Sequence, residues 1–356
     1  HYRYEKKIQI DPPTLGYPLF LLDLSEFKLN LSDEVPVLWL RREDLRRLSP
    51  LNLVQSMNDA TKLVKIFDAP VLVLVEGQAA GFRSYAPHFG CHYVFFDESQ
   101  QLEVINSRRP LGHLLDIIVD QLLLTEISPY RAEGIVTGSR FFNRSTEKNK
   151  ILAHLDESYL IVGIRQIGKT SLMKEIIREL ELREKIKEGE GFFKYFDCSQ
   201  YERNDQFIRD VVRWLHINDL TRVDRQDPNF FFPNFLERMR KKYQRRILFF
   251  LDEIDQLVAI QGGSADLFNT MRASFQQGSC NFIMAGWRGI SRESSKNDSA
   301  LYNFADRIEL NEFTRMQARE MILVPFDNMR INLADREEVV SRIYAETAGR
   351  PNLIQV

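Results

Sequence analysis

The sequence has no apolar run long enough to cross a membrane. Its compact apolar stretches, such as 19–22 and 247–251, have the length of buried strands, whereas a spanning helix needs about 20 apolar residues. We also find no signal peptide, although the sequence begins with His1 and not with Met, so the original start is expected to lie upstream. These absences predict a cytoplasmic protein without a membrane partner.

Cysteine is scarce, and neither sign of charge dominates. Three cysteines, Cys91, Cys198 and Cys280, are odd in number and far apart, which favours reduced thiols in the cytosol. His88 and His92 flank Cys91, but no second Cys/His cluster completes a four-coordinate metal site. A net charge of -2 gives no overall attraction to nucleic acid, so a nucleic-acid partner stays open but is not indicated.

The first third of the chain predicts a small domain with little chemistry. Residues 1–34 contain three prolines and are interpreted as an N-terminal arm. Within residues 35–133, buried strands at 35–40, 71–75 and 93–96 alternate with helices at 51–67 and 111–127. Continuous apolar strands between helices indicate a parallel sheet covered on both faces, so we expect an α/β domain for sensing or docking.

A phosphate-binding loop follows, and it is the most specific pattern in the chain. Residues 159–162 form a short apolar strand, Gly163 to Thr170 match G-x-x-x-x-G-K-T, and an amphipathic helix covers 172–182. We expect both glycines to supply positive φ, Lys169 to reach the β- and γ-phosphates, and Thr170 to coordinate Mg²⁺. The predicted nucleotide-binding residues of this loop are Gly163, Ile164, Arg165, Gln166, Ile167, Gly168, Lys169, Thr170 and Ser171.

A second strand ends in carboxylates and predicts the other half of the nucleotide site. The run at 247–251 is followed by Asp252 and Glu253. Asp252 is expected to hold Mg²⁺, usually through water, and Glu253 to orient and polarise the attacking water. A further buried strand at 281–285 precedes Arg288, which is a candidate sensor of the γ-phosphate and otherwise a surface arginine.

Taken together, these motifs resemble the signal-transducing ATPases with numerous domains, the STAND class of P-loop NTPases, and the related archaeal and origin-recognition-type AAA+ ATPases. The segment 141–147 is similar to the family's box of two hydrophobic residues followed by Gly-Arg-Glu-x-Glu. Arg144 and Glu147 match it, while Asn143 and Ser145 depart from it. Gly349-Arg350-Pro351 resembles a Gly-x-Pro signature whose proline contacts the nucleotide. Arg144 and Pro351 are therefore expected nucleotide contacts.

The resemblance implies a P-loop core at 134–312, with a parallel sheet of order 5-1-4-3-2, and a helical lid at 313–356 that the sequence truncates. It implies ATP/ADP and Mg²⁺ as cofactors, and slow, regulatory ATP hydrolysis. The leading hypothesis is a nucleotide-controlled switch or scaffold that forms a homo-oligomer or binds an effector protein, in signalling such as prokaryotic antiviral defence. The alternative is a DNA-linked AAA+ loader or transposition-regulator ATPase. A third reading, an N-terminal nuclease or hydrolase, lacks its motif.

Overall fold

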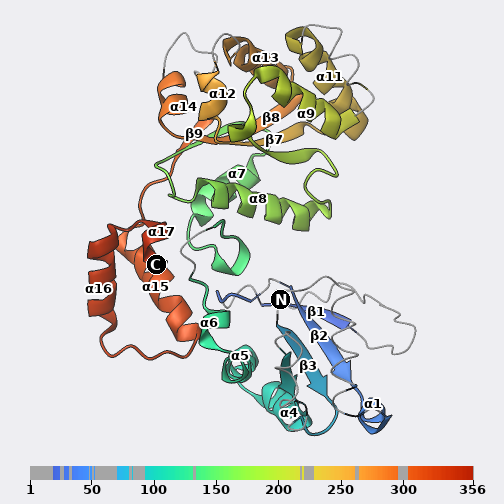
Figure 1. Cartoon of the computed structure of the whole chain (residues 1–356), viewed down its shortest axis with the longest axis vertical. Coiled ribbons are helices and arrows are strands. Elements are labelled where there is room, and N and C mark those ends of the chain that lie inside the picture. Colours follow the sequence, from blue (N-terminus) through green and yellow to red (C-terminus); the bar gives the residue numbers. More distant parts are fainter. Residues whose placement is uncertain are drawn as a thin grey trace. The chain divides into compact units, whose positions relative to one another are not determined.

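The computed structural model describes residues 19–24, 28–31, 34–47, 49, 52, 70–79, 82, 93–130, 134–216, 219, 228–260, 264–295 and 304–355. They belong to two compact units (Figure 1). The first unit comprises ranges within 1–131, 138–142 and 316–346, and the second comprises ranges within 132–137, 143–315 and 347–356. The predicted helix 51–67, apart from Asn52, and the segment with His88, Cys91 and His92 lie outside the described residues.

The first unit is built on a four-stranded sheet of order β1-β2-β3-β4. β2 (Glu34–Leu40), β3 (Val71–Val75) and β4 (Tyr93–Phe96) are parallel, as their apolar runs predicted. β1 (Leu19–Asp23) pairs antiparallel to β2, with Leu22 opposite Val35. The parallel pairing expected within residues 35–133 is therefore confirmed, and the segment interpreted as an arm adds an antiparallel edge strand that was not expected.

Among its described residues, this unit has one helix after β2 and three after β4. They are α1 (Arg42–Arg47), α4 (Glu98–Asn106), α5 (Pro110–Gln121) and α6 (Leu124–Ile127). The predicted single helix 111–127 is two helices, because the backbone at Leu122 turns extended, with φ -107° and ψ 153°. Asp97, which follows β4, caps α4 by accepting a hydrogen bond from the Gln100 amide.

Two helices from near the C-terminus complete the first unit. α15 (Arg315–Asn328) and α16 (Arg336–Thr347) belong mostly to it. Met329, which follows α15, joins the core that contains Leu115 and Ile118. The Tyr130 hydroxyl donates to the carbonyl of Ile322 at 2.7 Å. The segment predicted as one lid, 313–356, is thus divided, with 316–346 in the first unit and 347–356 in the second.

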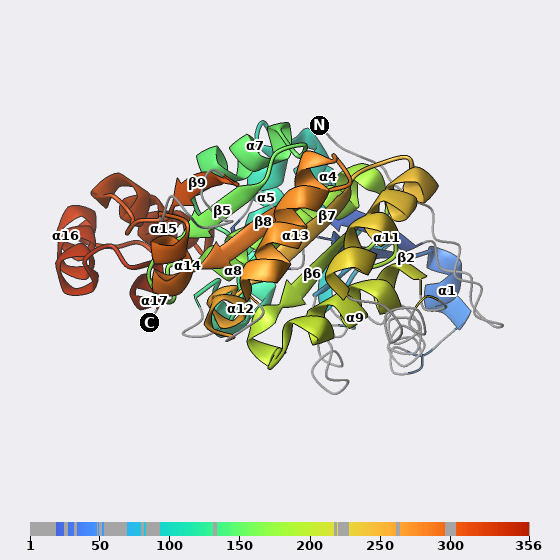
Figure 2. The same cartoon turned by 90° about the horizontal axis from the view of Figure 1, so that it is seen from above.

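The second unit contains a five-stranded parallel sheet of order β6-β7-β8-β5-β9 (Figure 2). Numbered along the chain from β5, this order is 5-1-4-3-2 when it is read from β9. The strands are β5 (Tyr159–Val162), β6 (Phe193–Asp197), β7 (Ile247–Asp252), β8 (Cys280–Gly286) and β9 (Asp306–Glu309).

The second unit also contains helices, several of which pack against this sheet and its buried aromatic side chains. They are α7 (Ser145–Ala153), α8 (Lys169–Glu184), α9 (Asn204–His216), α11 (Pro228–Tyr243), α12 (Asp255–Ala259), α13 (Ser264–Gln276), α14 (Arg288–Glu293) and α17 (Pro351–Ile354). Phe249 of β7 stacks on Phe282 of β8, with ring centroids 5.1 Å apart. Pro233 lies inside α11.

Candidate functional site

The phosphate-binding loop runs from the end of β5 to the start of α8. Gly168 has φ +101° and immediately precedes α8, so a side chain there would be strained. Gly163 does not have positive φ, so that expectation is wrong for it. A Cβ on Gly163 would instead lie 2.8 Å from the Leu310 carbonyl oxygen and 2.9 Å from Cγ2 of Ile167. The first glycine is required by close packing and the second by backbone conformation.

Lys169 holds its ammonium group inside the loop. The Nζ atom donates to the carbonyl oxygens of Gly163 and Ile164, each at 3.0 Å, and the residue is only 8% exposed. Burial lowers the pKa of Lys169, while the carboxylates of Glu253 and Asp252 act in the opposite direction. A partly desolvated cation attracts an anion more strongly than an exposed one, which suits a site for phosphate.

Asp252 is the most enclosed carboxylate of the site, at 2% exposed. Its Oδ2 accepts hydrogen bonds from the Thr170 hydroxyl at 2.6 Å and the Tyr195 hydroxyl at 2.9 Å. Its Oδ1 accepts one from the Glu253 amide at 2.9 Å. The structure therefore brings together the two side chains predicted to hold Mg²⁺.

The donor set fits a magnesium ion bound together with a nucleotide. Mg²⁺ prefers oxygen ligands, keeps several waters and commonly uses one or two protein groups plus phosphates. Thr170 and Asp252 supply those oxygens. Among the described residues, no group of three or more His, Cys, Asp or Glu side chains gathers as a metal cage would require.

The structure describes the side-chain exposure of Glu253 but not that of Arg288. Glu253 is exposed at the carboxyl end of β7 and has φ +49°, an uncommon conformation for a residue with a side chain. Arg288 is the first residue of α14, directly after β8, and its side chain lies outside the described part of the chain. Both roles stay predictions.

Arg144 is buried and contacts other residues of its own unit, the second unit. Its guanidinium donates to the Asn311 carbonyl, lies 3.5 Å from the Glu147 carboxylate and sits over the Phe313 ring at 4.8 Å. Burial lowers the pKa of Arg144, and Glu147 opposes that shift. Arg144 also precedes α7 with φ +59°, and the helix begins at Ser145. A nucleotide contact by Arg144 stays a prediction.

The Gly-x-Pro segment lies against the loop. Ala348 and Gly349 have φ +50° and +73°, and the Gly349 carbonyl accepts from the Phe313 amide at 2.8 Å. Pro351 does not end a helix but begins α17. The next residue, Asn352, donates its side-chain amide to the Gln166 side chain at 3.1 Å.

The remaining loop residues divide by exposure. Arg165 and Gln166 are exposed, whereas Ile167 is buried. The Ser171 hydroxyl accepts a hydrogen bond from the Val136 amide at 3.2 Å, so it is engaged with the connector that precedes α7. Sequence reasoning missed Tyr195 and Asn352. No motif marks Tyr195, but Asn352 stands beside the Pro351 that was singled out.

Comparison with known families decides the class. Residues 141–356, more than half of the chain, match the model of a family described as an ATPase domain predominantly from Archaea. The chain belongs to this family. It therefore contains an ATPase domain with a nucleotide-binding site, and the matched range includes the phosphate-binding loop, Asp252 and the Gly-x-Pro segment.

The ATPase also has weaker similarities to solved structures, each at 15% identity. A Walker-type ATPase of Pyrococcus abyssi gives a TM-score of 0.47 and covers 64% of this chain and 69% of its own. The Aeropyrum pernix ORC1 protein in complex with DNA gives 0.44 and covers 60% and 58%. AMPPCP-bound DnaA from Aquifex aeolicus gives 0.40 and covers 61% of each chain.

The ATPase thus spans about three fifths of the ORC1 and DnaA chains. No curated protein matches the sequence. Among the described residues, none of the helices is both long and apolar enough to span a membrane.

Proposed function

We propose that this ATPase is a molecular switch or scaffold of the STAND type, in which the bound nucleotide controls assembly and signalling. ATP hydrolysis is slow and regulatory in this proposal. The signal passes to further copies of the chain or to an effector protein, in a setting such as prokaryotic antiviral defence. The family match supports the ATPase, and the arrangement of the Gly-x-Pro segment supports the switch.

The observation that carries the proposal is that the chain runs from α16 directly into a segment that contacts the phosphate-binding loop. α16 ends at Thr347, and residues 347–355 then belong to the second unit, where Asn352 bonds Gln166 of the phosphate-binding loop. The helix that precedes this segment belongs mostly to the first unit. A nucleotide that moves the loop would pull on a segment joined directly to that unit, and such a link can bias a two-state equilibrium.

The residues of the site divide the chemistry between them. Lys169 would neutralise phosphate charge, and Thr170 and Asp252 would hold a magnesium ion, which when bound would supply charge stabilisation to the transferring phosphoryl group. Glu253 accepts a hydrogen bond from the attacking water and polarises it. Its exposed position allows that water to arrive from solvent.

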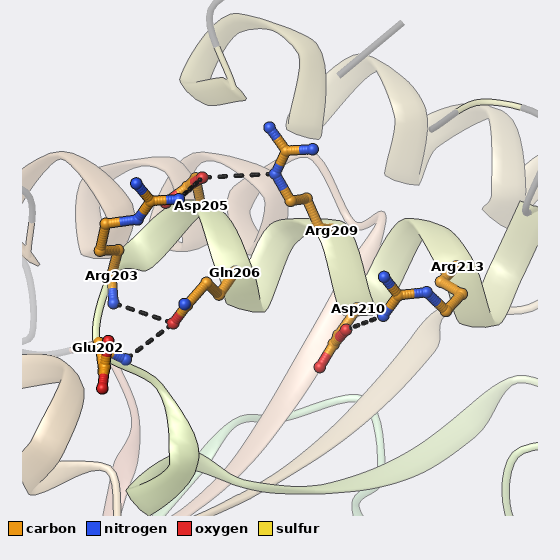
Figure 3. A network of polar contacts seen from close by, with 7 residues as sticks. All are labelled: Glu202, Arg203, Asp205, Gln206, Arg209, Asp210 and Arg213. Atoms are coloured by element: carbon orange, nitrogen blue, oxygen red, sulfur yellow. Dashed lines mark hydrogen bonds and ion pairs between the residues drawn. The ribbon is translucent and has the colours of Figure 1, made fainter. Parts of the chain in front are cut away.

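A DNA-linked loader or transposition regulator is the second candidate, and the charges on α9 favour the switch over it. Arg203 and Arg209 both pair with Asp205, at 3.1 and 3.4 Å, and Arg213 pairs with Asp210 (Figure 3). A surface that binds the DNA backbone needs cations that exchange for counterions. These arginines, with Arg203 just before α9 and the other two within it, are already paired with carboxylates.

Sedimentation velocity without nucleotide, with ADP, and with ATP plus Mg²⁺ tests the switch. We expect a larger or more compact species only with ATP, and we expect Glu253→Gln to retain that species for longer because an amide polarises water poorly. A protein whose size and shape are the same in all three states would contradict the switch, even if it hydrolyses ATP.

A separate titration tests the alternative. Binding of duplex DNA is followed by fluorescence anisotropy over a range of salt concentrations. Under the switch hypothesis, any binding is weak and shows no nucleotide dependence. Tight, ATP-dependent binding that falls steeply with salt would favour the loader, because several phosphate contacts release several counterions.

A further inference from the structure

Tyr195 places a hydroxyl on the carboxylate of the metal site from a neighbouring strand. It lies on β6, two residues before Asp197, and Asp197 is in register with Asp252 of β7. Because side chains alternate along a strand, Tyr195 and Phe196 face opposite sides of the sheet. Phe196 packs with Phe207, with centroids 5.5 Å apart, while Tyr195 reaches Oδ2 of Asp252 at 2.9 Å.

The hydrogen bonds to Asp252 leave little of its acceptor capacity open. A carboxylate offers about four acceptor positions. Oδ2 accepts from the hydroxyls of Thr170 and Tyr195, and Oδ1 accepts from the Glu253 amide. One further position remains, on Oδ1, for a hydrogen bond from outside these three groups.

The Tyr195 ring is itself fixed. The Lys174 ammonium lies 3.4 Å from the ring centroid, one helical turn after Thr170 on α8. Glu188 accepts from the Tyr195 amide at 2.9 Å and lies 3.5 Å from Lys174 Nζ.

We propose that Tyr195 is a positioning residue for magnesium. By occupying Oδ2 together with Thr170, it orients the Asp252 carboxylate so that Oδ1 is the oxygen that accepts a hydrogen bond from metal-bound water. Groups that form hydrogen bonds with a metal-ligating carboxylate typically set the orientation of that carboxylate. Their loss lowers metal affinity or activity by about 10- to 100-fold. The inference rests on the magnesium site proposed above.

Magnesium titrations of nucleotide binding test this role. The affinity for a fluorescent methylanthraniloyl-ATP is measured at increasing Mg²⁺, and again in EDTA. We expect Tyr195→Phe to raise the half-saturating Mg²⁺ concentration about tenfold, with unchanged affinity in EDTA, because the variant keeps the ring beneath Lys174. Tyr201→Phe is the matched control. Tyr201 is 3% exposed and donates to Asp210 at 3.1 Å, so its loss should leave the Mg²⁺ dependence unchanged.

A double-mutant cycle with Asp252→Asn separates positioning from general packing. If Tyr195 acts through the Asp252 carboxylate, Tyr195→Phe should have little further effect in the Asp252→Asn background. Two results would overturn the role of Tyr195 alone: an unchanged titration in Tyr195→Phe while Asp252→Asn raises the half-saturating concentration, or fully additive effects in the double variant. An unchanged titration in Asp252→Asn would overturn the magnesium site and this inference together.

Discussion

At the scale of single residues, Lys169 shows how the loop is held ready for an anion. Its ammonium bonds the carbonyls of Gly163 and Ile164, which are the groups nearest to it in the loop. Those hydrogen bonds give the ammonium group partners within the protein, and burial lowers the pKa of Lys169. A phosphate oxygen offers a stronger, charge-assisted partner than a carbonyl does. The lysine therefore gains more from nucleotide than an exposed lysine would.

Lys169→Ala should abolish measurable ATP binding, because a hydrogen bond to a charged group contributes about 1.5 to 3 kcal/mol and this ammonium can make several. Calorimetric titration with ATP and Mg²⁺ checks it. Lys150→Ala is the control, since Lys150 is a half-exposed lysine of the same unit that pairs with Asp306 at 2.5 Å. Thermal unfolding without nucleotide should be nearly unchanged. Parental ATP affinity in Lys169→Ala would remove the lysine from the site.

At the scale of elements, the Asp255 carboxylate connects α12, which follows the strand that ends at Asp252, to α14, which begins at Arg288. Asp255, the first residue of α12, accepts hydrogen bonds from the amides of Trp287 and Ile290 in the first turn of α14. A Cβ on Gly286 or Gly289 would lie 2.6 or 2.7 Å from that carboxylate. The close fit leaves no room for a side chain at either glycine.

Asp255→Ala should destabilise the second unit by about 1 to 3 kcal/mol, because two helix amides lose their acceptor. Asp255→Asn retains one acceptor oxygen and should recover part of that loss. Denaturant unfolding followed by tryptophan fluorescence measures both. Asp205→Ala, which removes only exposed ion pairs, serves as the control and should cost less than about 1 kcal/mol. Equal unfolding midpoints for Asp255→Ala and the parent would show that α14 needs no acceptor there.

Buried strands were predictable from the sequence. The strands at 71–75 and 93–96 have the expected bounds, because an unbroken apolar run marks each one. The antiparallel strand at 19–23 was not assigned, since Leu19–Leu22 is equally apolar in either orientation. Periodicity identifies an element but does not say which partner it pairs with.

The candidate site divides in the same way. Lys169, Thr170 and Asp252 follow from motifs, because their spacing is set by one loop and one strand end. Tyr195 and Asp255 depend on how neighbouring strands align and where a later helix begins, and no local pattern encodes that. Arg144 was predicted as a nucleotide contact, which stays a prediction, and its contacts with Asn311 and Phe313 depend on long-range packing.

At the scale of the whole molecule, the chain passes between its two units five times, after residues 131, 137, 142, 315 and 346. The last connection differs from the rest, because it leads from α16 to a segment that bonds the phosphate-binding loop. In the proposed switch, this connection is the stretch of backbone through which the nucleotide would act on the first unit.

The last prediction concerns Pro351, the first residue of α17. Proline fixes φ and has no amide to leave unsatisfied at this helical position, so it holds the entry to α17 next to Asn352. Pro351→Ala should lower ADP affinity by about fivefold or more, since a typical coupling between sites has at least this size. It should also reduce the nucleotide-dependent change in sedimentation. The melting temperature without nucleotide should stay close to that of the parent, since φ near -65° is also accessible to alanine in a helix. Leu353→Ala, at an exposed position of the same helix, is the control. A large fall in melting temperature with unaltered ADP affinity would mean that Pro351 stabilises α17 and nothing more.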